Sequence, residues 1–429
     1  MEDHFTIALI NHSFQINYFS RRWELFAEDH PNVEVFLVAP KEYEWYAGKR
    51  YSYAGSITHT SKEIDKGNFH RRLVDMQTRP GWESDDYKPL FDKIKPDIIY
   101  LIGTNRSALY QLLKLREKFY PNTKVINFSM RGPAQNLRLD VENCGFFRKV
   151  WRVYQYHKAK KRLAYYNSHL DAVFCHYPEA IKCYRKEGFY GPIYMQTQVG
   201  VNPEWFHPDD NARKEIREKY NISDDTYLFG SASRFAPSKG LSDIVNALPT
   251  ERDDWKFLMM GTGNDEEVKY LSDLIKSRGL EDRVILPGMI DWYEIAKYWN
   301  AIDCAVHVPR TTLRWVETFS LSAVQPQATM KPVIGNTSGS VPYQLGFDEM
   351  IVPEGDLKSL KEKILWVLSH RDEARIVGEK MFRRTIDSFS IKHLNDMFYE
   401  TLVEDVLQGQ YDIKKIDMTQ YTPKNHEEK

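Results

Sequence analysis

Short apolar runs that alternate with helical stretches constrain the fold of this chain more than any other feature. Four runs in the first part each stop abruptly at polar residues: FTIALIN (5–11), VEVFLVAP (33–40), DIIYLIG (97–103) and KVINFSM (124–130). Such runs are typical of strands buried on both faces of a parallel sheet. Helical patterns such as 20–29 and 105–119 lie between them. The alternation predicts a doubly wound α/β sheet.

The second half repeats the alternation more regularly. Strands are predicted at 226–233, 255–261, 283–288, 304–309, 332–336 and 350–353, with helices between them and two more helices over 360–389 that break near Ser369. At 429 residues the chain is too long for one ordinary core, so we expect two Rossmann-like domains. The polar and aromatic stretch 41–85 is too long for an ordinary connection and is predicted to be a functional or partly ordered region.

Composition excludes several classes of protein. No run approaches the roughly 18–20 uninterrupted apolar residues that a spanning helix needs. The start, MEDHFTIALINHS, is acidic and soon turns polar, which is not the pattern of a secretion signal. The four cysteines show no close metal-ligand spacing. We therefore expect a cytoplasmic protein with reduced thiols.

Positive charge is concentrated in the first half. Residues 101–200 hold 17 Lys and Arg against 6 Asp and Glu, and 146–163 holds seven bases and no acid. On a helix, Phe147, Val150, Trp151 and Tyr154 of this run would share one face. That pattern is typical of a basic amphipathic helix on an anionic membrane, and the alternative is a packed helix with a solvated basic face. No nucleic-acid motif accompanies the charge, so nucleic acid is not expected.

The segment 309–344, PRTTLRWVETFSLSAVQPQATMKPVIGNTSGSVPYQ, reads as loop, helix, strand and turn. Thr318, Phe319 and Ser320 are predicted as the first helical turn, whose amides and positive dipole suit a phosphate. Glu317 would stand at the mouth of the site. Gln325 lies eight residues later, within roughly 80° around a helix, so one extended nucleotide-sugar would reach both. Alternatively, Glu317 is only an acid that favours a helix start.

Five motifs now occur in the order found in one known family. VETFSLSAVQ resembles the E-x7-E motif of retaining glycosyltransferases of family 4, with Gln325 in place of the second glutamate. The other four motifs are GSASRFAPSKG (230–240), KPVIGNTSGSVPYQL, MIVPEGDLKSL and VGVNPEWFHPDD (199–210). The resemblance as a whole covers roughly 170–390 well and the first 170 residues weakly.

The resemblance implies the GT-B architecture, with two doubly wound Rossmann-like domains facing a central cleft. The expected divisions are an acceptor-side domain at 1–198, a nucleotide-sugar domain at 199–388, and a returning helix (391–407 the candidate) with a polar tail at 389–429. It also implies that the anomeric configuration is retained, with departure and attack on the same face.

The resemblance assigns roles to individual residues. Glu317 would contact the donor sugar as the catalytic residue, while Arg234 and Lys239, with the amides of 318–320, would hold the charge that develops on the diphosphate. Two cations make a metal unnecessary, and no Asp-x-Asp motif is present. The ribose and base would meet Gln325, the Met289–Ile290 backbone and the glycine turn of Gly261 and Gly263.

The first domain departs from the family pattern. NHSFQINYFSRRW follows the first strand where a glycine-rich loop is usual, and Met130 and Arg131 follow the fourth strand where a histidine is often found. Ser13 and Arg131 are the acceptor-side candidates. His12 and His176 are possible substitutes for the missing histidine, although a lone histidine is more often structural.

The function predicted from these observations is transfer of a sugar from an NDP-sugar to a glycan, lipid-linked or other acceptor, without a bound cofactor. Two alternatives remain open. One is a non-catalytic GT-B protein that binds a glycan or supports a partner transferase. The other is a different GT-B enzyme, such as a nucleotide-sugar epimerase or a phosphorylase.

Overall fold

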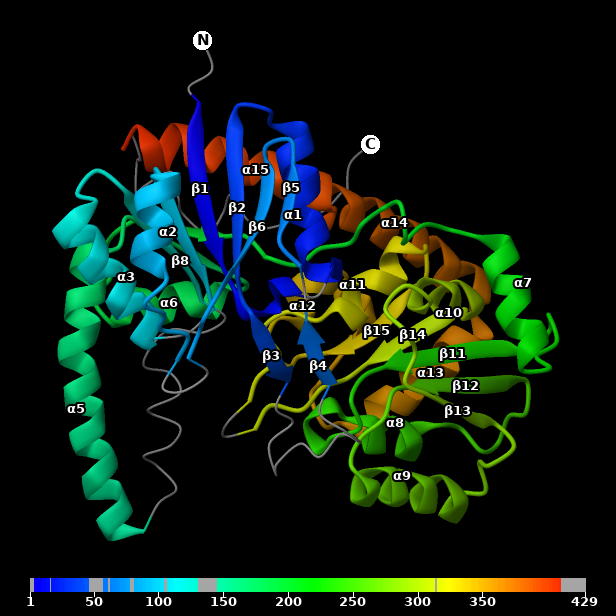
Figure 1. The fold of residues 1–429 in the computed structure, drawn as a ribbon. Coiled ribbons are helices and arrows are strands. Elements are labelled where there is room, and N and C mark those ends of the chain that lie inside the picture. The colour runs from blue at the N-terminus through cyan, green and yellow to red at the C-terminus, as the bar shows by residue number, and fades with distance from the viewer. Residues whose placement is uncertain are drawn as a thin grey trace. The chain divides into compact units, whose positions relative to one another are not determined.

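The computed structural model describes residues 4–15, 17–45, 57–60, 62–77, 81–103, 106–129, 145–312 and 315–409. They form two compact α/β units (Figure 1). The described part of the first unit comprises residues up to 45, 57–199 and 394–409, and that of the second comprises 200–393. The chain leaves the first unit after Val199 and returns at Leu394, compared with expected divisions at 198 and 388.

The first unit is built on an eight-stranded sheet in the order β10-β9-β8-β7-β1-β2-β6-β5. Only β5 runs antiparallel to its neighbour, β6. The strands are β1 (Phe5–Ile10), β2 (Val33–Pro40), β5 (Ile64–Lys66), β6 (Phe69–Val74), β7 (Ile98–Ile102), β8 (Lys124–Ser129), β9 (Ala172–Cys175) and β10 (Ile193–Met195). A separate antiparallel ribbon pairs β3 (Glu42–Trp45) with β4 (Ile57–Thr60).

The stretch 41–85 is therefore more regular than its sequence predicted, because it supplies the sheet strand β6. Two adjacent arginines inside this strand, FHRRLV, hide its apolar character. Arg71 is nevertheless buried, and its Nη2 donates a hydrogen bond to Ser20 Oγ at 2.8 Å.

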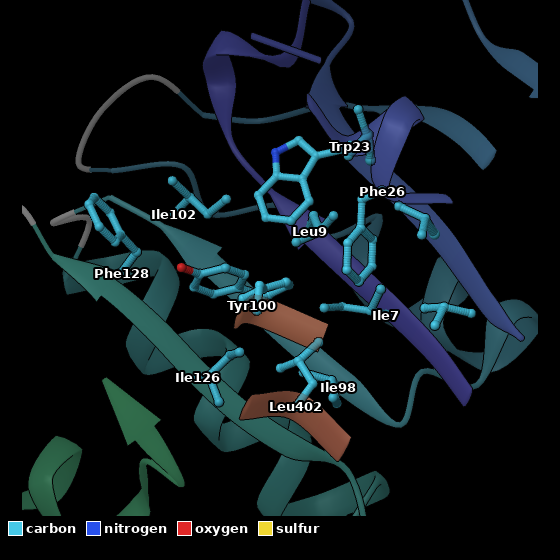
Figure 2. Packing of buried hydrophobic residues seen from close by; sticks show 14 of the residues in the cluster. Ile7, Leu9, Trp23, Phe26, Ile98, Tyr100, Ile102, Ile126, Phe128 and Leu402 are labelled. Carbon is cyan, nitrogen blue, oxygen red and sulfur yellow. The ribbon is translucent and has the colours of Figure 1, made fainter. Parts of the chain in front are cut away.

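Alternate residues of each central strand enter two different cores, as the pleat of a strand requires. Ile7 and Leu9 of β1 pack with Trp23 and Phe26 of α1 (Asn17–Asp29) (Figure 2). Residues of the opposite strand face pack on helices of the other layer, namely α2 (Tyr87–Ile94), α3 (Arg106–Phe119) and the C-terminal end of α5 (Phe146–His169). The remaining helix of the unit, α6 (Pro178–Lys186), follows β9.

The C-terminal segment completes the first of these two cores. Phe398 of α15 (Ile391–Glu400), together with Leu402 and Val406 of the π-helix Thr401–Leu407, lies in the same cluster as Trp23. The buried guanidinium of Arg22 fixes the start of this segment. It donates to Asn395 Oδ1 at 2.9 Å, to the Thr197 carbonyl at 2.7 Å and to the Leu394 carbonyl at 3.1 Å.

The second unit has a six-stranded, all-parallel sheet in the order β13-β12-β11-β14-β15-β16. Its strands are β11 (Tyr227–Ala232), β12 (Trp255–Met260), β13 (Val284–Gly288), β14 (Cys304–His307), β15 (Val333–Asn336) and β16 (Ile351–Val352). Counted along the chain, this is the order 3-2-1-4-5-6 of the Rossmann fold, which reverses between β11 and β14. The doubly wound parallel sheets predicted from the sequence are confirmed.

Helices connect these strands, and the predicted break near Ser369 separates the last two. The helices are α7 (Asp210–Lys219), α8 (Leu241–Ala247), α9 (Asp265–Ser277), α10 (Ile295–Ala301), α11 (Leu321–Ala328), α12 (Val341–Leu345), α13 (Leu357–Ser369) and α14 (Arg371–Phe389). Short 3-10 helices occupy His12–Gln15, Pro237–Lys239 and Asp348–Met350. None of the helices in the described ranges is long and apolar enough to cross a membrane.

Arg22→Met should destabilise the protein by about 2–4 kcal/mol, because it leaves two buried carbonyls and the Asn395 amide without their donor. Arg21→Met is the matched control. Arg21 precedes it on the same helix, is 26% exposed and pairs with Glu24 at 2.9 Å, so its loss should cost less than about 0.5 kcal/mol. Urea unfolding followed by circular dichroism measures both. Equal costs would contradict the proposed anchoring by Arg22.

Candidate active site

The topological switch point of the second unit brings together two sets of predicted residues. The strands β11 and β14 are neighbours in the sheet, and the strand order reverses between them, so the loops that follow them begin side by side at the carboxyl edge. Arg234 and Lys239 follow β11, and Glu317 follows β14. Ligands of doubly wound sheets bind at such a point.

Lys239 and Glu317 form a direct ion pair. Lys239 Nζ lies 2.8 Å from Glu317 Oε2, and it also lies 4.3 Å from the centroid of the Trp315 ring. The Glu317 side chain is only 7% exposed and that of Lys239 only 14%. Glu317 is therefore buried against a cation, whereas the sequence placed it at an open mouth. Two residues predicted to contact different parts of one ligand, the diphosphate and the sugar, are thus direct partners in this structure.

Two glycines with left-handed backbone allow this close approach. Gly240 has φ +68°, and a Cβ there would fall 1.9 Å from the Val308 carbonyl oxygen. Gly339 has φ +53°, and its Cβ would fall 2.0 Å from the Glu317 carbonyl oxygen. The Ser340 N–H donates to that same Glu317 oxygen at 2.9 Å. The backbone on either side of the ion pair is therefore fixed by contacts that a larger residue would break.

His307 is a site residue that sequence reasoning missed. It ends β14, is 3% exposed, and places its Nε2 3.8 Å from Glu317 Oε2. Burial, assisted by the charge of Lys239, lowers the pKa of His307 to about 3. The imidazole is therefore neutral at physiological pH. The available signal was a histidine in the otherwise apolar strand CAVHVP.

The helix after Glu317 begins later than predicted. Helix α11 starts at Leu321, Ser320 has the extended backbone of an N-cap, and Thr318 and Phe319 precede the helix. The reason is Gln344, whose Oε1 accepts from the Ser320 N–H at 2.9 Å and whose Nε2 donates to the Ser320 carbonyl at 2.8 Å. The prediction that 318–320 form the first turn is wrong, and the Ser320 amide already has an acceptor.

Gln325 lies on α11 with 3% of its surface exposed. Its Oε1 accepts a hydrogen bond from the Trp299 indole Nε1 of α10 at 3.1 Å. Glu317 is not on this helix, so the angular relation predicted between Glu317 and Gln325 is also wrong. The contact of Gln325 with a ribose stays a prediction.

Three loops on the other side of the switch point are joined by backbone hydrogen bonds. The Phe235 N–H donates to the Thr262 carbonyl at 2.7 Å, and the Gly261 N–H donates to the Gly288 carbonyl at 2.8 Å. The structure thus brings together the half-buried Arg234, the turn of Gly261 and Gly263, and the turn that precedes Met289 and Ile290. Gly261, at φ +128°, is required there because a Cβ would fall 1.8 Å from the Ser233 carbonyl oxygen. Met289 is 71% exposed.

The first-unit candidates are described by their own surroundings. Ser13 lies in the 3-10 helix after β1, and its N–H donates to Asn11 Oδ1 at 2.6 Å. Met130 and Arg131 lie outside the described residues.

The two histidines considered for the first domain are buried against neighbouring side chains. His12 stacks on Trp82 with ring centroids 4.5 Å apart, and burial lowers its pKa to about 4. His176 Nδ1 lies 3.0 Å from Thr197 Oγ1, and burial lowers its pKa to about 3.

Residues 212–384 match the family model described as "Glycosyl transferases group 1". That range contains every predicted residue of the second unit, from Arg234 to Gln325. A curated relative, the N-acetyl-alpha-D-glucosaminyl L-malate synthase of Bacillus anthracis, is 26% identical over 199 residues, which are 45% of this chain and 49% of that protein. The chain spans about half the length of the curated relatives it matches.

Solved structures match over nearly the whole chain. Sucrose-phosphate synthase of Thermosynechococcus elongatus has a TM-score of 0.69 at 18% identity, covering 92% of this chain and 98% of that one. The Anabaena protein Alr3699/HepE, crystallised with UDP and glucose, has a TM-score of 0.65 at 15% identity, covering 93% of this chain and 99% of that one. The fold is that of the GT-B glycosyltransferases. At these identities the GT-B likeness concerns the fold alone, while the family model concerns the second unit.

Gly339→Ala should cost more stability than Gly279→Ala. Both positions have similar positive φ, +53° and +63°, so the backbone strain of about 1–2 kcal/mol is shared. A Cβ at Gly279 would meet no atom within 4 Å, whereas at Gly339 it would collide with the Glu317 carbonyl. We expect a further loss of about 1–3 kcal/mol for Gly339→Ala, measured by urea unfolding. Equal losses of stability would contradict the prediction, because they would mean that the loop around Gly339 moves away from the Glu317 carbonyl at no cost.

Proposed function

We propose that this protein transfers a sugar from a nucleoside-diphosphate sugar to an acceptor with retention of anomeric configuration. The observation that carries the proposal is the buried Lys239–Glu317 pair at the switch point of a Rossmann sheet, within the segment that matches the glycosyltransferase model. Proteins of the same fold include one crystallised with UDP and glucose. A nucleotide-sugar is the ligand class that fits these facts together.

The proposed chemistry requires charge to be held where the leaving group forms. The anomeric C–O bond breaks while negative charge grows on the diphosphate. Lys239 and Arg234 would neutralise that charge, together with backbone amides at the start of α11. Because this helix begins at Leu321, these amides are those of Leu321 and Ser322 and not those of 318–320. Glu317 would face the sugar and favour a cationic anomeric carbon. The leaving phosphate would take the proton of the acceptor, which attacks from the same face.

We further propose that the reaction needs no metal ion or other cofactor. The reason is electrostatic, because two fixed side-chain cations would already neutralise most of the charge of a diphosphate. Nucleotide binding in a chelator such as EDTA should therefore match binding in Mg²⁺.

Glu317→Gln should separate binding from turnover. Turnover should fall by roughly 10²–10³-fold, since the charge facing the developing cation is lost. The affinity for a nucleoside diphosphate should stay equal or rise, because Lys239 no longer has to leave a carboxylate to bind phosphate. Lys239→Met should instead weaken nucleotide binding at least tenfold. Calorimetry in EDTA and nucleotide release from a panel of NDP-sugars measure the two quantities.

Lys269→Met is the matched control for the lysine variant. Lys269 is exposed on α9 and pairs with Asp273, so its variant should bind nucleotide normally. Normal turnover by Glu317→Gln would contradict the role of Glu317. Unchanged nucleotide affinity in Lys239→Met would place the diphosphate elsewhere.

One observation favours a second candidate, a non-catalytic GT-B protein that binds a glycan or supports a partner transferase. The position where the family motif has its second glutamate holds Gln325, whose Oε1 is bound to Trp299. A protein of this kind would bind the nucleotide or a glycan and release no nucleotide from any donor. The same release assay therefore separates the two candidates.

We also propose that the first unit binds an anionic membrane through α5, where a glycan or lipid-linked acceptor would be presented. Among the α5 side chains that the structure describes, the buried ones, Leu163 and Tyr166, lie near its C-terminal end. Figure 1 shows its N-terminal half extending past the other helices of this unit. Exposed apolar side chains there include Phe147 (88%), Trp151 (61%) and Tyr154 (62%).

These side chains repeat at helical spacing, with Val150 56% exposed between them, so they make one apolar stripe. An exposed stripe of this kind marks an interaction surface. The acid-free run 146–163 that contains the stripe also holds seven bases, and their charge is complementary to anionic lipid. The alternative interpretation, a packed helix with a solvated basic face, fits the C-terminal end of α5, where Leu163 and Tyr166 are buried. It does not account for the exposed apolar side chains of the N-terminal half.

Replacing Lys158, Lys160, Lys161 and Arg162 together by glutamine should abolish binding to anionic liposomes. Each base near such a surface contributes about 1 kcal/mol, so four account for roughly a 10³-fold change in partitioning. Phe147→Ser with Trp151→Ser should also reduce binding, whereas Tyr190→Ser, at a tyrosine 72% exposed elsewhere on this unit, should not.

Flotation with anionic and neutral liposomes, at low and high salt, measures this binding. Equal recovery on both lipids, or none on either, would contradict the proposal. Absence of liposome binding together with self-association through the stripe would assign the surface to a second copy of the chain.

A further inference from the structure

Two nitrogen groups face the same oxygen of Glu317. Lys239 Nζ lies 2.8 Å from Oε2 and His307 Nε2 lies 3.8 Å from it. Only the lysine is within hydrogen-bond distance. His307 Nε2 is buried and has no hydrogen-bond partner among the residues that the structure describes.

A buried ring nitrogen without a partner is uncommon and calls for an explanation. His307 is neutral because burial lowers its pKa, so its ring carries a single proton and Nε2 can donate when it holds that proton. A neutral donor is compatible with the nearby ammonium group of Lys239, whereas a second cation would repel it. The imidazole is thus suited to the carboxylate beside it.

Movement of about 1 Å would turn the 3.8 Å separation into a hydrogen bond. The two backbones are fixed, since His307 lies on a central strand paired with Gly335 and the Glu317 carbonyl is held by Ser340. The adjustment therefore belongs to the Glu317 side chain. In this structure Oε2 is bonded to Lys239 and lies out of hydrogen-bond reach of His307 Nε2, and departure of Lys239 would free the carboxylate to turn toward the imidazole.

We propose that His307 is a positioning residue that takes over the Glu317 carboxylate when Lys239 turns to the diphosphate of the donor. The proposal rests on the function proposed above for Lys239 and Glu317. It accounts for the unpartnered nitrogen of His307 and gives the buried carboxylate a hydrogen-bond donor after Lys239 leaves. Through His307, the carboxylate stays aimed at the sugar while the lysine serves the phosphate.

The first test uses the protein without nucleotide. His307→Leu keeps an apolar side chain of similar size in the strand, and Lys239→Met removes the competing cation. The fall in melting temperature caused by His307→Leu should be at least about 3 °C larger in the Lys239→Met background than in the native background, measured at pH 8. His307→Gln, which can still donate, should show a smaller difference. Equal falls in both backgrounds would make His307 an ordinary core residue and overturn the proposal.

The second test uses turnover of a donor. His307→Leu should lower kcat at least tenfold while KM and the affinity for a nucleoside diphosphate change by less than about twofold. His307→Gln should recover part of the lost kcat. In the Glu317→Gln background, His307→Leu should cause no further loss, because the histidine acts through the carboxylate. An undiminished loss in that background would overturn the positioning role.

The two tests separate this proposal from the proposed function. Thermal coupling between His307 and Lys239 without turnover of any NDP-sugar would leave the histidine in its role toward Glu317 and reject the transferase. Turnover that depends on Glu317 and Lys239 but not on His307 would retain the transferase and reject the positioning residue.

Discussion

A carboxylate and an ammonium group lie together inside the second unit, and the arrangement of the loops around them depends on that pair. Removing each charge from water costs several kcal/mol, which only close geometry and further hydrogen bonds offset. Here the geometry comes from two neighbouring strands, β11 and β14, whose following loops meet at 2.8 Å between Lys239 and Glu317. Gly240 and Gly339 permit that approach because any Cβ would overlap a carbonyl oxygen. The pair therefore requires glycine at positions that do no chemistry themselves.

The sequence predicted the fold well where strands are buried on both faces, because continuous apolar runs such as FTIALIN have few other structures open to them. It failed at β6, where Arg71 and Arg72 interrupt the run. Arg71 is buried in the sheet unit because Ser20, far away in the chain, accepts its hydrogen bond. No local pattern reports a partner of that kind. The returning segment after 394 likewise depends on Arg22, which binds Asn395 across 373 positions of sequence.

The sequence allowed candidate residues to be chosen but did not predict how they contact one another. The order of motifs identified Lys239, Glu317 and the glycine turns, since each motif is local in sequence. It did not reveal that the first two bind one another, because pairing depends on strand order in the sheet. The start of α11 was misplaced because Gln344, 24 residues later, holds the Ser320 amide. The hydrogen bond from Trp299 to Gln325 joins two helices, α10 and α11, and could not be predicted from the sequence either.

Under the proposed function, the Lys239–Glu317 ion pair also links binding of the diphosphate to the interaction of Glu317 with the sugar. A diphosphate must draw Lys239 away from Glu317, so part of its binding energy is used to release the carboxylate. Glu317 would then become available to the sugar only when a phosphate group is present to hold the lysine. A buried carboxylate left without any partner would be strongly destabilising, and His307, 3.8 Å from Glu317 Oε2, can replace the lysine without adding charge. Charge balance in a dry site thus couples recognition of the leaving group to the readiness of the residue beside the sugar.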